Sequence, residues 1–423
     1  MTFDLAIEAV AHDVPTGWKV EEFRRHATIV DEVNADSGMP LLSLASTGVV
    51  APRSEEGGMG RQIPSESTIE RYWIARPGNL VVNPMWLVGG GIGVSQTTGA
   101  VSPDYRVYRL GPELFPPFVH HLLRSRPYRD QYRLYTRAET TFDRRVSKQN
   151  FHPMPLLIPP LEEQRRIAEF LDAETAHIDR LAAAQREFSA KLEERDSALL
   201  DIAIDELIQS VGTQPFRRFI VGMDQGTSPQ CDANPADDDE WGVLKVSCLR
   251  PGAFFPAQNK RLPEGVLPNI RGEVRAGDLL ITRANTPELV GSTAVVPTVR
   301  RKLLLSDKIF RVRADSSLDP RYIALIARGS RVRALCSASS NGASQSMANI
   351  RFEEVKEWPI PPASRSVQRE VVARVDQTLR QVENLRSRIN CQLALLDERR
   401  QTLIAAAVTG RLDVTTAQRT SIV

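Results

Sequence analysis

Two segments of the chain alternate apolar and charged positions with a seven-residue period. The pattern runs over residues 167–199 and again over 371–403, and neither stretch contains proline or glycine. Such spacing predicts two long helices with narrow apolar seams, each of which needs a partner helix. We expect the two helices to pair with each other; packing of each helix on its neighbouring domain is the alternative. The predicted pairing positions are Ile167, Leu171, Ile178, Leu181, Leu192, Leu199, Val371, Val375, Val382, Leu385, Leu396 and Leu403.

The two helical segments are copies of one another. At an offset of 204 residues, Gln164 matches Gln368 and Leu192 matches Leu396. Both copies follow an Ile-Pro-Pro entry, which begins at Ile158 in the first and Ile360 in the second. A repeat of this length indicates duplicated domains rather than a solenoid.

The first helical segment is long and acidic. A helix from Leu161 to Leu207 would extend about 70 Å at 1.5 Å per residue, which suits a spacer. Its acidic side chains outnumber its basic ones about two to one. Because phosphates would be repelled, we expect this helix to face protein rather than nucleic acid.

The remaining segments are mixed and rich in turn residues. Short apolar runs between Gly, Pro and Asn clusters predict strands of small sheets, and Gly78–Leu80 resembles Gly277–Leu279. The predicted fold class is α+β, with two mixed domains separated by two long helices that form an antiparallel coiled coil, related by a pseudo-two-fold internal repeat. The predicted boundaries are 1–158 for the first domain, 159–210 for its helix, 211–360 for the second domain, 361–414 for its helix and 415–423 for a tail.

Charge is distributed locally rather than globally. The 423 residues carry a net charge of only +2, so no overall field attracts the chain to nucleic acid. Arginine-rich stretches at 124–148 and 300–333, one in each mixed domain, predict two phosphate-contacting surfaces. Ordinary solvated surface is the alternative for both stretches.

Polar residues near the predicted strands are candidates for contacts to DNA bases. Base recognition needs polar side chains held at a groove, with phosphate contacts fixing the protein's position. Each candidate could equally be an ordinary turn residue. The candidates are Arg283, Asn285, Asn341 and Gln345 in the second domain, and Gln96, Arg144, Arg145 and Lys148 in the first.

Two motifs resemble parts of a methyltransferase. Asn83–Trp86 resembles its Asn-Pro-Pro-aromatic box, and Gly89–Gly93 resembles a glycine-rich cofactor loop. Only two residues separate them, which leaves no room for the helix and strand that would lie between them, so we interpret both as turns. We therefore expect no catalytic residue, no cofactor such as S-adenosylmethionine or ATP, and no metal.

The remaining sequence features indicate a cytoplasmic protein. None of the four cysteines lies in a Cys-x-x-Cys pair or has a histidine at metal-ligand spacing, which fits a reducing compartment. The first residues lack the features of a signal peptide, and no apolar run is long enough to cross a membrane.

Two motifs carry a family resemblance that extends over essentially the whole chain. Ile158–Asp172 resembles the central conserved region of type I restriction-modification specificity subunits, and Leu396–Val414 resembles their distal conserved region. The order of variable domain, helix, variable domain, helix also matches. The first helix departs from the pattern at Ala198–Ile204, because it lacks the Ala-Val-Thr-Gly exit of the second.

The resemblance implies a non-catalytic DNA-binding subunit. Two target-recognition domains would each read one half of a bipartite site in double-stranded DNA. Methyltransferase subunits would bind the helical scaffold and carry the restriction and translocase subunits. The alternatives are a stand-alone DNA methyltransferase or nuclease, and a coiled-coil assembly protein that does not bind DNA.

Overall fold

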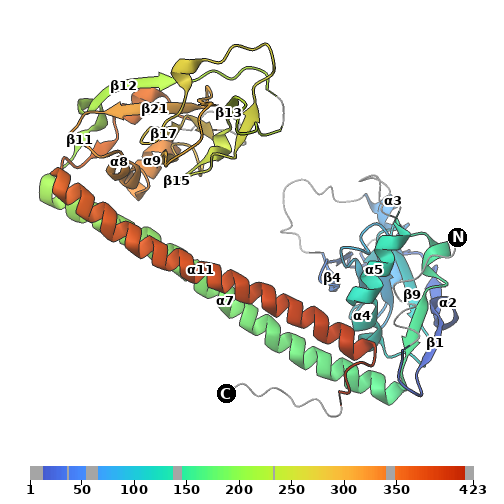
Figure 1. Ribbon diagram of the computed structural model, residues 1–423. Helices are drawn as coiled ribbons and strands as arrows, with labels where there is room; N and C mark the ends of the chain where they lie inside the picture. The colour runs from blue at the N-terminus through green and yellow to red at the C-terminus, as the bar shows by residue number, and fades with distance from the viewer. Residues whose placement is uncertain are drawn as a thin grey trace. The chain divides into compact units, whose positions relative to one another are not determined.

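The computed structural model describes residues 13–35, 38–53, 65–136, 145–231, 234–339 and 348–414. The chain divides into two units, Met1–Gln185 with Asn390–Val423 and Arg186–Ile389. Each unit contains one mixed α/β domain and half of each of two long helices, α7 (Leu161–Val211) and α11 (Arg365–Val408) (Figure 1).

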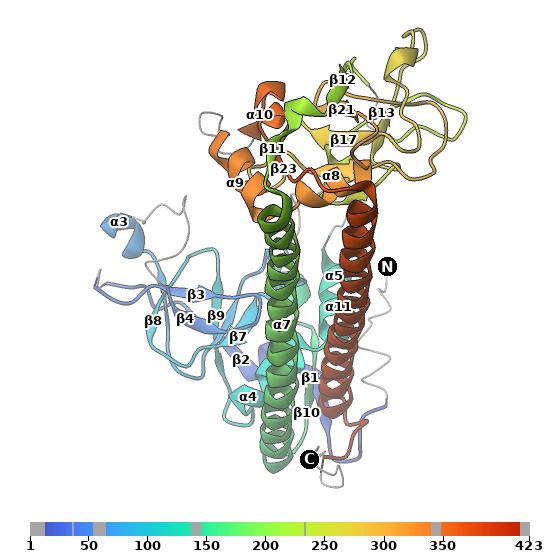
Figure 2. The same ribbon diagram turned by 90° about the vertical axis from the view of Figure 1, so that its left-hand side faces the viewer.

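Within each unit, α7 and α11 run antiparallel and lie side by side (Figures 1 and 2). In the second unit Arg374 lies 3.1 Å from Glu206 and Arg386 lies 3.7 Å from Glu193, so residue numbers rise along one helix as they fall along the other. In the first unit Arg400 lies 3.6 Å from Asp179. These contacts confirm the expected antiparallel coiled coil.

The seam between the helices differs from the predicted one at every second position. The residues of α7 with little exposure include Ala168, Thr175 and Ala182, each one residue away from the predicted series, and α11 repeats the shift. Leu181 and Leu385 were expected in the seam but are 39% and 36% exposed, so both assignments are wrong. Small side chains at the seam allow a close approach of the two backbones, and the leucines beside them point outward. The other predicted positions are buried or partly buried: Ile167, Leu171, Ile178, Leu192, Leu199, Val371, Val375, Val382, Leu396 and Leu403.

The first mixed domain is built on a four-stranded antiparallel sheet. Its strand order is β2-β9-β6-β7, with two helices, α4 and α5, following the sheet in the chain. Its core includes Phe118 and Leu122 of α4 and continues into α7 and α11 through Ile167 and Ala407. The elements are β1 (Lys19–Glu22), α2 (Phe23–His26), β2 (Ala27–Val30), β3 (Leu42–Leu44), β4 (Val50–Pro52), α3 (Glu66–Ile69), β5 (Trp73–Ala75), β6 (Leu80–Val82), β7 (Ile92–Val94), β8 (Gly99–Val101), β9 (Arg106–Leu110), α4 (Pro116–Arg124), α5 (Arg126–Tyr135), α6 (Lys148–Phe151) and β10 (Pro155–Ile158).

The second mixed domain repeats this arrangement with a sheet of order β12-β21-β17-β19 and adds a three-stranded sheet of order β16-β13-β20. Gly78 and Gly277 occupy the same turn before β6 and β17, and both have positive φ angles, 84° and 90°. The elements are β11 (Gln214–Pro215), η1 (Phe216–Arg218), β12 (Ile220–Gln225), β13 (Gly242–Leu244), η2 (Val246–Cys248), β14 (Leu249–Arg250), β15 (Ala253–Phe254), β16 (Asn259–Arg261), η3 (Ile270–Gly272), β17 (Leu279–Thr282), β18 (Ala284–Asn285), β19 (Thr293–Val295), β20 (Leu303–Leu304), β21 (Ile309–Ala314), α8 (Pro320–Ile326), α9 (Ser330–Ser339), β22 (Ala348–Asn349), α10 (Phe352–Lys356) and β23 (Pro359–Ile360).

A buried glutamine joins each domain to its helix in the same way. Gln164 Oε1 accepts from the backbone N–H of Phe115 at 2.8 Å, and its Nε2 donates to the carbonyls of Glu113 and Pro159, both at 2.9 Å. Gln368 makes the same three bonds at an offset of 204 residues, at 2.7 to 2.8 Å. Its partners there are Asp319, Ser317 and Ala363. The duplication therefore extends to individual hydrogen bonds.

Replacing Gln368 with leucine should destabilise the second unit. The substitution leaves one N–H and two carbonyls without their partner, and an unsatisfied buried polar group costs about 1–3 kcal/mol. We expect the free energy of unfolding to fall by at least about 3 kcal/mol, measured by urea denaturation that is monitored by circular dichroism. Gln377→Leu, at an exposed position of the same helix, is the matched control and should have little effect. Equal stabilities of the two variants would contradict the anchoring role.

Candidate nucleic-acid interface

Two arginines of the first arginine-rich stretch, Arg124 and Arg129, hold neighbouring loops of the domain. Arg124 donates to the carbonyls of Gly90, Ile92 and Ser46, and burial lowers the pKa of its guanidinium to about 10. Arg129 donates to the carbonyl of Val88 at 3.2 Å. These two side chains stabilise loops by hydrogen bonds to backbone carbonyls, so they are not available for phosphate contacts.

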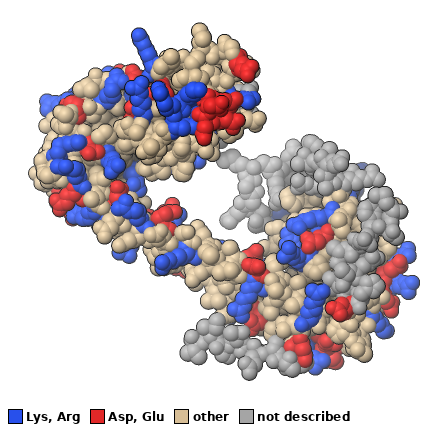
Figure 3. Space-filling view, viewed as in Figure 1, with Lys and Arg blue, Asp and Glu red and all other residues tan. Residues whose placement is uncertain are grey.

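The second stretch behaves in the same way. Arg311 donates to the carbonyls of Arg271 and Glu273 and forms ion pairs with Asp224 and Asp278. Arg333 donates to the carbonyls of Val290 and Glu288, and Arg300 to that of Glu240. On the face shown in Figure 3, acidic side chains are interspersed with the basic ones over both units. Several arginines of both stretches are therefore engaged within the protein, and phosphate contact by the remaining basic side chains stays a prediction.

A cavity of about 560 Å³ opens where β9 begins, at the end of the first domain's sheet. Arg106, Arg145 and Lys148 bring positive charge to it, and Asp104 lies 3.9 Å from Arg145. Burial lowers the pKa of Arg106, whose Nη2 donates to the carbonyl of Val146 at 2.9 Å. We call it the β9 cavity; its remaining lining residues are Ile29, Val30, Asp31, Trp73, Pro103, Tyr105, Val107, Ser147 and Gln149.

A second cavity, of about 360 Å³, opens where β21 begins in the second domain. Its charged lining residues are Lys245, Lys260 and Lys308, and no ion pair joins them to any other described residue. We call it the β21 cavity; its remaining lining residues are Ser228, Pro229, Cys231, Val243, Leu244, Val246, Ser247 and Ser306.

The two cavities occupy equivalent positions. β9 and β21 are the second strands of sheets with the same order, and each cavity lies at the start of that strand. Their linings differ, with arginine, aromatic and amide groups in the first and lysines and hydroxyls in the second. Equivalent sites with different side chains can contact the same kind of ligand while recognising different details of it.

In the first domain, the sequence candidates divide between the two ends of the sheet. Arg145 and Lys148 line the β9 cavity. Gln96 is exposed in the turn after β7, at the other end of the sheet, where Leu80 pairs with both Val94 and Tyr108. Arg144 lies outside the described residues.

In the second domain, Arg283 lies beside the β21 cavity. It is half-buried, and its backbone N–H donates to the carbonyl of Lys308 at 2.8 Å. Asn285 is only 7% exposed because β18 pairs with β22, and its Oδ1 accepts from the backbone N–H of Thr286. Its Nδ2 has no hydrogen-bond partner among the described residues, so a contact from Asn285 to DNA stays a prediction. Asn341 and Gln345 lie outside the described residues.

Several lining residues were not predicted as contacts. Trp73, Lys245 and Lys260 are far apart in the sequence from the candidates, and Gln149 follows the candidate Lys148 without forming a motif. Ser306 is the exception, because its match to Ser102 at the offset of the repeat marks the start of the equivalent strands.

The methyltransferase-like motifs lie together in one hairpin loop. Asn83–Trp86 and Gly89–Gly93 connect β6 to β7, and the backbone N–H of Asn83 donates to the carbonyl of Gly91. This arrangement agrees with their interpretation as turns. In the described part of the chain, no group of three or more His, Cys, Asp or Glu side chains is placed to hold a metal ion. No described helix combines the length and apolar character needed to span a membrane.

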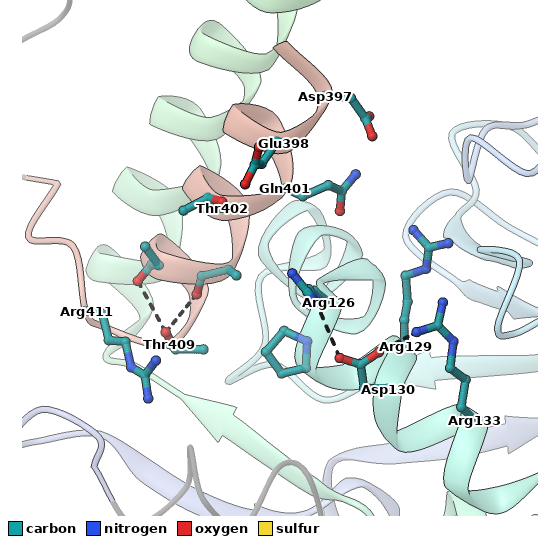
Figure 4. A pocket seen from close by; sticks show the side chains of 13 residues that line it. Arg126, Arg129, Asp130, Arg133, Asp397, Glu398, Gln401, Thr402, Thr409 and Arg411 are labelled. Carbon is teal, nitrogen blue, oxygen red and sulfur yellow. Dashed lines mark hydrogen bonds and ion pairs between the residues drawn. The ribbon is translucent and has the colours of Figure 1, made fainter. Parts of the chain in front are cut away.

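The largest cavity described here, of about 690 Å³, lies in the first unit between α5 and α11. Figure 4 shows Arg126, Arg129 and Arg133 projecting from α5, with Asp397 and Gln401 on α11 across the cavity. Arg126 and Arg133 both form ion pairs with Asp130 of their own helix. We call this the α5–α11 cavity; its other lining residues are Pro127, Glu398, Thr402, Ala405, Ala406, Thr409 and Arg411.

The equivalent place in the second unit is closed. There the backbone N–H of Ser330, at the start of α9, donates to Asp201 of α7 at 2.8 Å, and Arg331 lies 3.0 Å from Asp205. At the offset of the repeat, Asp201 corresponds to Ala405 and Asp205 to Thr409, so neither carboxylate of these two contacts is present in the first unit. The open cavity is thus a specific difference between the two copies.

Several curated proteins resemble the chain in sequence, whereas no family model matches it. The specificity subunit of the type I restriction enzyme EcoEI from Escherichia coli is 33% identical over 173 residues, 40% of this chain and 29% of that protein. The specificity subunit of EcoKI from Escherichia coli strain K12 is 25% identical over 324 residues, 72% of this chain and 67% of that protein. The chain thus aligns with less than a third of the EcoEI subunit.

Two solved structures share the fold. The first comes from work on the assembly and conformational transition of the type I restriction-modification system. It has a TM-score of 0.68 and is 19% identical in sequence. The match covers 95% of this chain and all of that one. The HsdS subunit from Thermoanaerobacter tengcongensis has a TM-score of 0.50 and 19% identity, covering 94% of this chain and 98% of that one. The chain is therefore similar in sequence to specificity subunits of type I restriction enzymes, and it shares its fold with the solved HsdS subunit.

Proposed function

We propose that the chain is the sequence-specific DNA-binding subunit of a type I restriction-modification complex and performs no catalysis itself. Its two domains, 1–158 and 211–360, would each read one half of a bipartite target. The helical segments 159–210 and 361–414 would set the spacing between the halves. The complex would act in the cytoplasm, where chromosomal DNA is found.

The observation that carries this proposal is the pair of β9 and β21 cavities. They occupy equivalent positions in duplicated domains, both are lined by basic side chains, and their polar groups differ. Basic groups position a protein on phosphates, and differing polar groups allow two different sequences to be read. The named relatives are specificity subunits, which supports the same role here.

Among the sequence candidates, Arg145, Lys148 and Arg283 are the ones we assign to DNA contact. Arg145 and Lys148 line the β9 cavity, and Arg283 adjoins the β21 cavity through Lys308. Arginine can donate two hydrogen bonds to guanine O6 and N7, a contact worth about 1–3 kcal/mol of discrimination.

Filter binding of genomic DNA fragments tests this proposal against its alternatives. The chain, with and without its methyltransferase partner, should retain a sequence-defined subset of fragments. An assembly protein would retain none, and a stand-alone enzyme would modify or cut DNA without the partner.

We further propose that a methyltransferase subunit docks at the α5–α11 cavity and carries the restriction subunits with it. Its α5 wall is basic and its α11 wall includes Asp397 and Glu398, so a polypeptide with charges of both signs would match it. The contacts that close the equivalent place in the second unit are missing here.

Gln401→Trp should weaken assembly with the methyltransferase by at least about tenfold, because filling a docking cavity displaces its occupant, and tenfold corresponds to about 1.4 kcal/mol. Binding would be measured by titration calorimetry. Gln377→Trp, at an exposed position of α11 in the other unit, should leave affinity unchanged. Equal affinities for both variants would exclude this cavity as the docking site.

A further inference from the structure

We propose that Ser306, Lys245 and Lys308 form a binding site for one phosphodiester of the DNA backbone. The inference rests on the proposed DNA-binding function and deepens it, because it assigns the β21 cavity to the backbone rather than to a base. Arg283, beside it, would then be the residue that reads a neighbouring base.

The charge of the cavity suits an anion. Lys245, Lys260 and Lys308 line it, and none of them has an ion-pair partner among the residues that the structure describes. The nearby carboxylate, Asp307, is not a lining residue and accepts a hydrogen bond from Ser228. The lining of the cavity therefore carries three ammonium groups and no carboxylate.

Ser306 supplies the second, independent observation. It lines the cavity, is only 4% exposed, and its Oγ has no hydrogen-bond partner among the described residues. A buried hydroxyl left without a partner costs about 1–3 kcal/mol, so such groups are uncommon unless a ligand satisfies them.

The matching residue in the first domain is used differently. Ser102, which corresponds to Ser306 at the offset of the repeat, accepts from the backbone N–H of Asp104 at 3.3 Å. The second domain keeps the serine but leaves the hydroxyl unengaged beside the lysines. The difference points to a role for Ser306 that Ser102 does not have.

The backbone around these side chains is held in place. Lys308 accepts from the N–H of Arg283 and immediately precedes β21, and the N–H of Lys245 donates to the carbonyl of Gln258 at 2.9 Å. The backbone N–H of Ile309 donates to the carbonyl of Ser306. A phosphate bound here would lie next to Arg283, which orients that arginine toward the adjoining base.

The salt dependence of DNA binding tests the site. Each phosphate contact contributes about 0.9 to the slope of log affinity against log salt, so Lys308→Ala should reduce the slope by about one. At 0.15 M salt the affinity should fall about fivefold, equally for specific and random duplexes. Lys191→Ala, which removes an exposed lysine paired with Glu187 in the same unit, is the matched control and should change neither quantity.

Ser306→Ala separates ligand binding from folding. Removing an unpaired buried hydroxyl should leave the melting temperature of the free protein unchanged or raise it, while DNA affinity falls. Loss of stability without loss of affinity would overturn the role of Ser306.

Two further outcomes are distinguishable. If the parent protein with its methyltransferase binds no DNA, the proposed function fails. If the parent binds and Lys308→Ala keeps its slope, only the phosphate site fails. Inorganic phosphate at millimolar concentration should protect the parent from thermal unfolding no more than sulfate does; selective protection by phosphate would indicate a free-phosphate site and contradict the assignment to DNA.

Discussion

Exchanging residues 211–360 for the same segment of a relative with a different target should change one half of the methylated sequence and leave the other half intact. The second domain contains its own sheets, a hydrophobic cluster that lies wholly within it and the whole β21 cavity. Its substitution therefore replaces one complete set of contacts to DNA. Sequencing of methylated sites in cells expressing the hybrid would identify both halves.

The distance between the halves should stay the same in this exchange, because the hybrid keeps both α7 and α11. A hybrid with an unchanged target would show that the second domain reads no bases. A change in both halves would show that the domains do not act independently. The reciprocal exchange of residues 1–158 should alter the opposite half.

Replacing both Leu192 and Leu396 with lysine should strongly destabilise the protein. Leu192 is buried and Leu396 is partly buried along the helix seam. Each substitution removes an apolar side chain from the seam and places an ammonium group there, which should cost about 3 kcal/mol or more at the buried site. The melting temperature, followed by circular dichroism at 222 nm, should fall by many degrees.

The matched control is the pair Leu181→Lys and Leu385→Lys. These positions are related by the same offset of 204 residues, lie on the same two helices and are exposed. The structure predicts little change in melting temperature for this pair. If both double variants lose the same amount of stability, the seam follows the series expected from the sequence rather than the one in the structure.

The duplication and the long helices could be predicted from the sequence because both depend on regular spacing. A sustained seven-residue period predicts a helix that packs on a partner helix, and the matching copy supplies that partner. The correspondence of Gln164 with Gln368 was visible as a repeat. Only the structure shows that both side chains hydrogen-bond to the backbone of their domain.

The register of the seam could not be predicted because at some positions along it the larger, more apolar side chain is not the less exposed one. Leu181 is more hydrophobic than Ala182, and Phe188 more than Ser189, so the apolar pattern favoured the larger residues. In the structure the smaller neighbour takes the less exposed position each time. Close helix packing depends on the space between two backbones, which a single sequence does not reveal.

The candidate nucleic-acid interface was predictable only in part, because a sequence does not show which groups a basic side chain contacts in the folded protein. Arg124 and Arg311 looked free in the sequence, yet backbone carbonyls and carboxylates surround them. Lys245 and Lys308 are 63 residues apart and line one cavity because β13 ends near the place where β21 begins. Tertiary structure decides which basic side chains remain available for phosphates.

The central claim is that one chain reads two separate half-sites. Methylome sequencing of a restriction-deficient host that expresses the chain with its methyltransferase partner tests this claim most directly. All methylated sites that depend on the chain should fit a single motif with two specified halves and an unspecified spacer of constant length. A contiguous motif, or methylation that does not change when the chain is omitted, would contradict it.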